Sequence, residues 1–161
     1  MTNEAAHQKG WQIFEVVVGL PFLAAIGLQL GLPIPFPSTS LMPIILAVGI
    51  VLIVAGVLFV SLARREFARL DQPTDPGLTT NKIITNGVFS YSRNPLYLGG
   101  FLFLTGIALV FRITWAFILL VPAGVACHIL LIMPEEKYLA ARFGDQYLEY
   151  TATVRRWIGR K

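Results

Sequence analysis

The sequence predicts an all-α integral membrane protein with about four transmembrane helices followed by a C-terminal interfacial helix. Two observations lead to this fold class. The chain of 161 residues is 55% hydrophobic and only 14% charged, whereas soluble domains usually contain about 25% charged residues. Four apolar runs also divide the chain, and most approach the roughly 20 residues needed to cross a bilayer. The predicted helices cover residues 11–30, 41–63, 95–111 and 113–133.

The connections between the four runs differ greatly in length. The first run is long and lacks a small-residue cleavage site, so it is interpreted as a span and not as a signal peptide. The uncharged, proline-rich segment 31–40 is a turn, and the second run contains no charge. The third run is short and turns directly into the fourth around Arg112. A polar loop, 64–94, and a polar tail, 134–161, complete a single domain, 1–161.

The positive charges predict an orientation. With four spans, the N-terminus, the loop 64–94 and the tail share one side, which holds 12 of the 13 Lys and Arg residues, and Arg112 alone lies on the other. This asymmetry predicts that both termini, and a site on the basic side, are cytoplasmic. The cations can meet anionic lipid headgroups, so no nucleic-acid partner is expected. The oligomeric state is not predicted.

The tail is predicted to form a helix at the membrane interface. Pro134 suits a first helical position, and Glu135 and Glu136 complement the helix dipole there. Apolar and aromatic side chains recur at steps of three and four residues, which places them on one helical face: Leu139, Phe143, Tyr147, Tyr150, Val154 and Trp157. Gly144 is a point at which this helix can break.

Two polar blocks, residues 81–99 and 134–150, flank the third and fourth runs. Because the turn between these runs is short, the helix pair should return the second block beside the first at one membrane face. The stretch 98–100 is expected to permit close helix packing. No Gly-rich nucleotide fingerprint follows a strand, and the chain has no room for a Rossmann domain beyond its spans. A nucleotide-containing cofactor must therefore bind between the helices and the two blocks.

The first block begins a helix in a way that favours anion binding. Asn94 can cap the helix and Pro95 fits its first turn, so the free N–H groups at that end form an anion site. Arg93 either adds a donor fork for a carboxylate or pairs with Glu135 or Glu136. A helix end that accepts an anion, beside acids that can bind a cation, suits a zwitterionic ligand.

Few other residues are candidates for chemistry. Tyr97 lies three residues after Asn94 and either faces the same pocket or belongs to an interfacial aromatic belt. Ionisable groups within spans are functional candidates, which applies to Glu15 and His128, although an interfacial glutamate and a packed neutral imidazole are the simpler interpretations. Cys127 is interpreted as a packed hydrophobe, and no Cys/His cluster has metal-ligand spacing.

The residues of the two blocks form a recognisable pattern. The first block contains Gly87-Val88-Phe89 and then Arg93-Asn94-Pro95-Leu96-Tyr97-Leu98-Gly99. The second block combines acids, aromatics and a glycine: Glu135, Glu136, Leu139, Phe143, Gly144, Tyr147 and Tyr150. At this spacing, over about residues 80–158, the chain resembles the isoprenylcysteine carboxyl methyltransferases and the related membrane phospholipid methyltransferases.

The resemblance implies a methyltransferase that binds S-adenosyl-L-methionine without a Rossmann domain. Its acceptor would be a lipophilic small molecule from the bilayer, either an isoprenylcysteine-like carboxylate or a lipid amine. The implied cofactor-binding residues are Asn81, Lys82, Ile83, Ile84, Phe89, Asn94, Pro95, Leu96, Tyr97 and Glu135. The candidate catalytic residues are Arg93, Glu136 and His128, the last two as bases, since an amine or phenol acceptor needs one.

The chain departs from the family pattern at two positions. Asn94 replaces the commoner His, and an amide can cap a helix but cannot titrate. Leu131 stands where the isoprenylcysteine enzymes have an Arg that contacts the substrate, which argues against recognition of a prenylcysteine carboxylate.

Other functions stay open at this point. A small four-helix transporter could couple protons through Glu15, but it predicts short loops, whereas this chain has a long middle segment and a long tail. A structural or assembly protein would use the tail only as an anchor. The related sterol reductases have a similar membrane fold and a nicotinamide cofactor, but this sequence shows no basis for the additional phosphate contacts.

Overall fold

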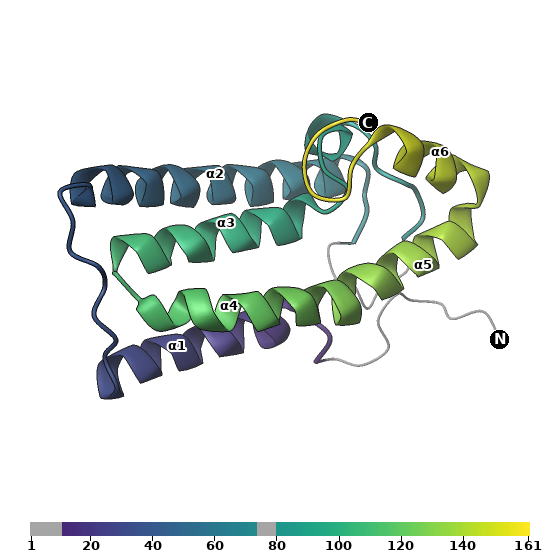
Figure 1. The fold of residues 1–161 in the computed structure, drawn as a ribbon. Helices are drawn as coiled ribbons and strands as arrows, with labels where there is room; N and C mark the ends of the chain where they lie inside the picture. The colour runs from purple at the N-terminus through teal and green to yellow at the C-terminus, as the bar shows by residue number, and fades with distance from the viewer. Residues whose placement is uncertain (1–10, 74–79) are drawn as a thin grey trace.

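The structure is a computed structural model that describes residues 11–73 and 80–161, and within these ranges it is helical without a strand. A π-helical segment, Glu15–Gly19, leads into α1, Leu20–Gly31. Two further helices, α2 (Met42–Arg69) and α3 (Pro95–Val110), are separated by a 3-10 turn at Gly87–Ser90. The remaining elements are α4 (Thr114–Cys127), a π-helical segment (His128–Ile132), α5 (Met133–Phe143) and α6 (Asp145–Thr153). In Figure 1, α1 to α4 lie alongside one another, and α6 lies at the end where α2 finishes and α3 begins.

Two helical segments of the described chain are long and apolar enough to cross a membrane. They are Met42–Arg69 and Thr114–Phe143, and only a small share of their residues is buried inside the protein. The segments Glu15–Gly31 and Pro95–Val110 are apolar but shorter. An all-α, membrane-like protein is therefore confirmed, whereas the count of four spans stays a prediction.

The second helix is longer than the sequence indicated. We predicted a helix over 41–63 and a polar loop from residue 64, but α2 continues to Arg69. The extension is stabilised by packing that the local sequence does not reveal, because Phe67 contacts the ring of Phe89 edge to face, with centroids 5.5 Å apart. The last turns of α2 thus leave the apolar run and support the first polar block.

The fourth helix does not end where the polar tail begins. We predicted a new helix starting at Pro134, but α4, the π-helical segment and α5 form one continuous helical rod (Figure 1). Proline has no N–H and its ring crowds the carbonyl four residues earlier. The wider π-helical turn accommodates this, since the N–H of Met133 bonds to the carbonyl of His128 five residues back.

The tail is not a single interfacial helix. It breaks at Gly144, as the sequence allowed, where φ is +53° and favours glycine. The predicted face also ends early, because α6 stops at Thr153 and Val154 pairs with Arg160 in an isolated antiparallel bridge. Tyr147, Tyr150 and Val154 are buried against Ile83 and α5. This apolar face therefore packs largely on the protein itself, and the interfacial location of the tail stays a prediction.

The closest helix packing joins α2 and α3. A Cβ atom added to Gly56 would lie 2.6 Å from the carbonyl oxygen of Gly99, and one added to Gly106 would lie 2.6 Å from the carbonyl oxygen of Gly49. The two backbones thus touch at two levels, as small residues permit in membrane helices. The expectation that the stretch 98–100 allows close packing is confirmed. A second core joins the π-helical segment before α1 to α4, and Cys127 is fully buried there as a free thiol.

We expect Gly56→Ala to destabilise the protein by about 1–3 kcal/mol, since an inserted methyl group must push two backbones apart. Thermal unfolding in detergent measures the effect. Gly27→Ala is the matched control, because nothing lies within 4 Å of its added Cβ atom, and alanine favours the helix there by about 0.5–1 kcal/mol. Equal melting temperatures for the two variants would contradict the packing described above.

Candidate functional site

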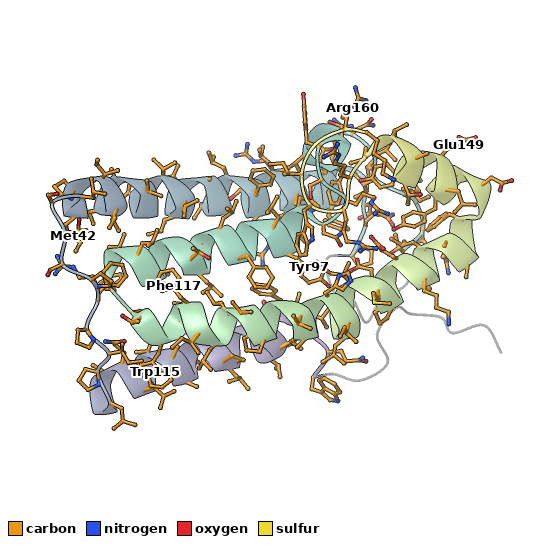
Figure 2. The ribbon with its side chains drawn as sticks, viewed as in Figure 1. Met42, Tyr97, Trp115, Phe117, Glu149 and Arg160 are labelled. Atoms are coloured by element: carbon orange, nitrogen blue, oxygen red, sulfur yellow. The ribbon has the colours of Figure 1, made fainter. Side chains whose placement is uncertain are left out.

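The short connection between α3 and α4 brings the two polar blocks together. Arg112 adopts a left-handed conformation with φ of +57°, which reverses the chain within a few residues. At the other end of the helix pair, the hydroxyl of Tyr97 donates a hydrogen bond to Oε2 of Glu135 at 3.1 Å. Figure 2 shows Tyr97 between α3 and the rod that α4 and α5 form. The predicted meeting of residues 81–99 with 134–150 is confirmed.

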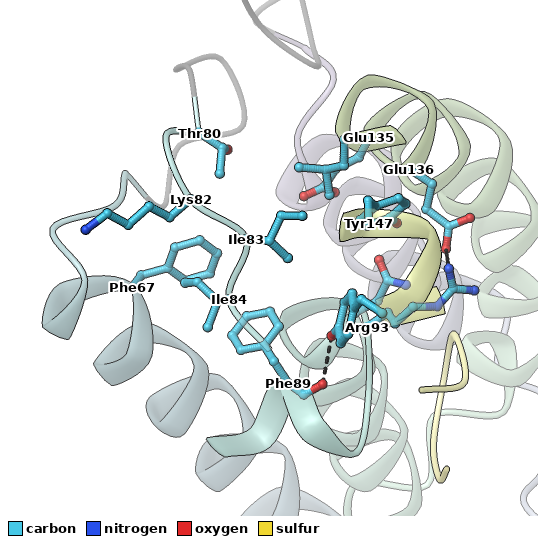
Figure 3. A pocket seen from close by; sticks show the side chains of 13 residues that line it. Phe67, Thr80, Lys82, Ile83, Ile84, Phe89, Arg93, Glu135, Glu136 and Tyr147 are labelled. Carbon is cyan, nitrogen blue, oxygen red and sulfur yellow. Dashed lines mark hydrogen bonds and ion pairs between the residues drawn. The ribbon is translucent and has the colours of Figure 1, made fainter. Parts of the chain in front are cut away.

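A small cavity of about 60 Å³ lies between the blocks (Figure 3). It is bounded by α2, the segment after residue 80, the start of α3, α5 and α6. Its lining combines charged groups with aromatic and aliphatic side chains: Phe67, Thr80, Lys82, Ile83, Ile84, Phe89, Arg93, Asn94, Glu135, Glu136, Leu139, Tyr147 and Tyr150. We call it the polar cavity.

A second cavity of about 240 Å³ adjoins the first, and we call it the larger cavity. The two share Phe67, Thr80 and Glu135 in their linings. The remaining lining combines two charged residues with a mainly apolar wall: Ile13, Phe14, Glu15, Val60, Arg64, Pro73, Leu96, Tyr97 and Gly100. Glu135 is thus a carboxylate at the boundary of both spaces.

The larger cavity has a wall built from aromatic rings. A Cβ atom added to Gly100 would lie 2.5 Å from the ring of Phe14, so only glycine lets that ring approach α3. Phe14 lies 6.0 Å from Tyr97 and 5.5 Å from Phe101, centroid to centroid. The chain before α1 is thereby held against α3, which places Glu15 at the cavity.

Two arginines surround Glu136. Arg156 donates to both carboxylate oxygens, from Nε to Oε1 at 3.0 Å and from Nη2 to Oε2 at 2.7 Å. Nη1 of Arg93 lies 3.3 Å from Oε1, and Figure 3 shows Arg93 and Glu136 lining the polar cavity. The sequence left open whether Arg93 binds a ligand or pairs with an acid, and the structure contains the pair with Glu136.

The side chain of Asn94 does not cap α3, which corrects the predicted role. Asn94 occupies the cap position and Pro95 the first turn, but the side chain makes no capping bond. Its Nδ2 donates instead to the carbonyl of Arg156 at 3.2 Å. The C-terminal segment folds back over this point, so the carbonyl of Arg156, 62 residues later in the sequence, can accept a hydrogen bond from the Asn94 amide.

The segment that carries Phe89 is fixed from two directions. Gly87 has φ of +59°, and an added Cβ atom would lie 2.5 Å from Oε1 of Glu66, so the turn at this position requires glycine. The hydroxyl of Tyr150 donates to the carbonyl of Phe89 at 2.7 Å. Phe89 is held between α2 and α6 in this way, and its ring lines the polar cavity.

The structure brings most of the candidate site residues together. Eight line the polar cavity: Lys82, Ile83, Ile84, Phe89, Arg93, Asn94, Glu135 and Glu136. Leu96, Tyr97 and Glu135 line the larger cavity. Pro95 is fully buried in the helix start, whereas Asn81 is exposed and accepts a hydrogen bond from Arg142 at 3.4 Å. His128 lines neither cavity, and its role as a base stays a prediction.

Sequence reasoning missed several residues of this region. Tyr147 and Tyr150 were interpreted only as part of an apolar face, although the spacing of the second block already included them. Phe67 and Arg64 fell within the segment predicted as a loop. Arg156 gave no usable signal, because its partner lies 20 residues earlier and beyond a break in the helix.

Comparison with known proteins gives one clear result. The model of a family described as phospholipid methyltransferase matches residues 44–146, which is more than half of the chain. No curated protein and no solved structure matches the sequence significantly. The matched range contains most of the lining of both cavities, while Glu15, Tyr147, Tyr150 and Arg156 lie outside it.

We expect the stability of the protein to fall as the pH rises from about 10 to about 12. Burial and the neighbouring Glu136 carboxylate raise the pKa of Tyr147 from 10.0 to about 12. Below pH 10 the phenol is neutral in both folded and unfolded chains, so its contribution is fully present. Above pH 10 the unfolded chain loses this proton first, and the contribution is lost as the pH approaches 12. Denaturant unfolding across this range should show a shallower decline for Tyr147→Phe than for the unaltered chain.

We expect Tyr150→Phe to lower the free energy of unfolding by about 1 kcal/mol, since it removes the bond to the carbonyl of Phe89. Unfolding in detergent measures this loss. Tyr91→Phe is the control, because Tyr91 is 61% exposed and its ring hydroxyl contributes nothing to this contact. A loss of the same size in both variants would contradict the assigned role of Tyr150.

Proposed function

We propose that this chain, which belongs to the phospholipid methyltransferase family, transfers a methyl group from S-adenosyl-L-methionine to a lipophilic acceptor at the boundary of its two cavities. The observation that carries the proposal is the contact between Tyr97 and Glu135. It joins the two polar blocks and places one carboxylate where both cavities meet. The two apolar helices and the family together indicate a membrane protein.

The polar cavity has groups that suit the methyl donor. This molecule carries a zwitterionic amino-acid end, an adenosine and a sulfonium. Arg93 can bind the carboxylate, since its buried Nε has no hydrogen-bond partner among the described residues. Glu135 can bind the ammonium group, and the rings of Phe67 and Phe89 offer flat apolar surfaces for the adenine.

The size of the polar cavity sets a condition on binding. Small-molecule sites usually enclose about 300–1,000 Å³, and this cavity encloses about 60 Å³. An adenosine therefore requires the side chains between the segment after residue 80 and α5 to move apart, or requires part of the donor to extend past Glu135 into the larger cavity. Such rearrangement of side chains on ligand binding is common.

The larger cavity suits the acceptor. Phe14, Val60 and Leu96 provide an apolar wall, while Glu15 and Arg64 add opposite charges at the same space. A molecule with an apolar body and a polar reacting end fits this lining. Both acceptor classes that the sequence suggested, a carboxylate and a lipid amine, remain candidates.

The chain's own groups would align the reactants and exclude water from the transfer. A carboxylate acceptor needs no base, whereas an amine must lose a proton. Both oxygens of Glu136 are engaged by arginines, so this residue is poorly placed to accept one. Glu135 lines both cavities and has one oxygen that is not bonded to Tyr97. That oxygen can bind the donor's ammonium group or accept the proton of an amine acceptor, and the two roles exclude each other.

The distribution of charge supports a cytoplasmic site. The described cations gather at the end of the bundle that carries the two cavities, and Arg112 lies at the opposite end. By the positive-inside rule this end faces the cytoplasm. The proposal therefore includes a cytoplasmic active site that a lipid substrate reaches from the inner leaflet.

We expect the purified protein in detergent to bind S-adenosylhomocysteine, and Glu135→Gln to weaken that binding by tenfold or more, because a charged hydrogen-bond partner is lost. Isothermal calorimetry measures both affinities. Glu149→Gln is the matched control, since Glu149 is exposed on α6 and lines neither cavity. Absence of any affinity in the unaltered chain would refute the use of this donor.

Transfer of a labelled methyl group to a membrane lipid extract then identifies the acceptor class. Release of the label by base as volatile methanol indicates a methyl ester, and a label that stays on the headgroup after base treatment indicates a methylated amine. If no donor binds and proton-coupled flux instead depends on Glu15, the transporter alternative gains the support that the proposal loses.

A further inference from the structure

The C-terminal segment, residues 154–161, closes over the start of α3 and is held there by several backbone bonds. We call it the C-terminal strap. The N–H of Gly159 donates to the carbonyl of Tyr91 at 2.7 Å, and the N–H of Arg93 donates to the carbonyl of Arg155 at 3.2 Å. The side chain of Asn94 bonds to the carbonyl of Arg156. The strap thus fixes the backbone that presents Arg93 to the polar cavity.

Arg156 is the point at which the strap reaches the ionic groups of the site. Its guanidinium binds both oxygens of Glu136 in a fork, with distances of 3.0 and 2.7 Å. Such bidentate pairs are the strongest and most directional of the charged hydrogen bonds. Arg93 keeps only the single, longer contact of 3.3 Å with the same carboxylate.

Because Arg156 takes both oxygens of Glu136, most N–H donors of Arg93 are not used by that carboxylate. A guanidinium has five N–H groups, and Nε of Arg93 is buried without a hydrogen-bond partner among the described residues. The side chain of Arg93 is only 11% exposed, and the hydroxyl of Tyr147 lies near it. Arg93 therefore retains N–H donors, on a largely buried side chain that lines the polar cavity, with which it can bind an anion.

We propose that Arg156 is a positioning residue: by occupying Glu136 it keeps Arg93 free to bind the carboxylate of the methyl donor's amino-acid end. The inference rests on the proposed function. Without Arg156, both carboxylate oxygens of Glu136 become available to Arg93. Arg93 would then form the bidentate pair itself and turn away from the ligand. The family model ends at residue 146, so this role comes from a part of the chain that the family match does not include.

The experiment compares two ligands that share the thioadenosine and differ in whether they carry the amino-acid end. S-adenosylhomocysteine carries the amino-acid end, and 5′-methylthioadenosine lacks it. We expect Arg156→Ala to weaken the binding of S-adenosylhomocysteine about tenfold or more and to leave methylthioadenosine unchanged within about twofold. Arg156→Lys keeps the charge but not the fork, so it should lose most of the same affinity.

Arg160→Ala is the matched control, because it removes one exposed positive charge from the same strap. Thermal unfolding in detergent reports whether each variant is folded. An equal loss for both ligands, or a loss of the same size in Arg160→Ala, would mean that the strap acts only by stabilising the fold and would overturn the inference.

A double-mutant cycle gives a second, independent measurement. If Arg156 acts through Arg93, the effect of Arg156→Ala on S-adenosylhomocysteine binding should disappear in an Arg93→Ala background. Losses that simply multiply would overturn the inference while leaving the proposed function intact. If the unaltered chain binds neither ligand, the proposed function itself fails and the positioning role fails with it.

Discussion

The turn at Arg112 is the constraint on which the site depends. It is so short that α3 and α4 must run back along each other, and the beginning of one helix must meet the continuation of the other. Tyr97 and Glu135 meet for this reason, although 38 residues separate them. Packing on both sides of the helix pair stabilises this contact. The glycines bring α2 against α3 on one side, and α1 packs on α4 on the other.

The two π-helical segments of the described chain, Glu15–Gly19 and His128–Ile132, also help to position the site. Each lies just before a proline in a helix, the first before Pro21 and the second before Pro134. A wider turn tolerates a missing N–H and relieves the crowding of the proline ring. The second segment lets the helix that begins at Thr114 continue as α5, so Glu135 and Glu136 are carried on a rigid element and not on a loop.

The sequence predicted those features that depend on neighbouring residues or on a single short turn. The apolar runs, the helix start at Pro95, the break at Gly144 and the meeting of the two blocks all fall in this class. The features that it did not predict depend on contacts across the chain. The extension of α2 rests on Phe67 meeting Phe89, and the side chain of Asn94 is redirected by a carbonyl that only the folded strap supplies.

The unbroken helical rod from α4 to α5 also fixes the distance between the α3–α4 turn and Glu135. At about 1.5 Å per residue, the axial distance from Thr114 to Glu135 is about 30 Å, which matches the thickness of a typical hydrocarbon core. In a bilayer with Thr114 at one surface, the carboxylate of Glu135 would lie at the other, where headgroups begin. The height of the proposed reacting centre relative to the lipids would then be set by the length of a helix, and the thickness of the surrounding bilayer would help to decide which part of a lipid meets it.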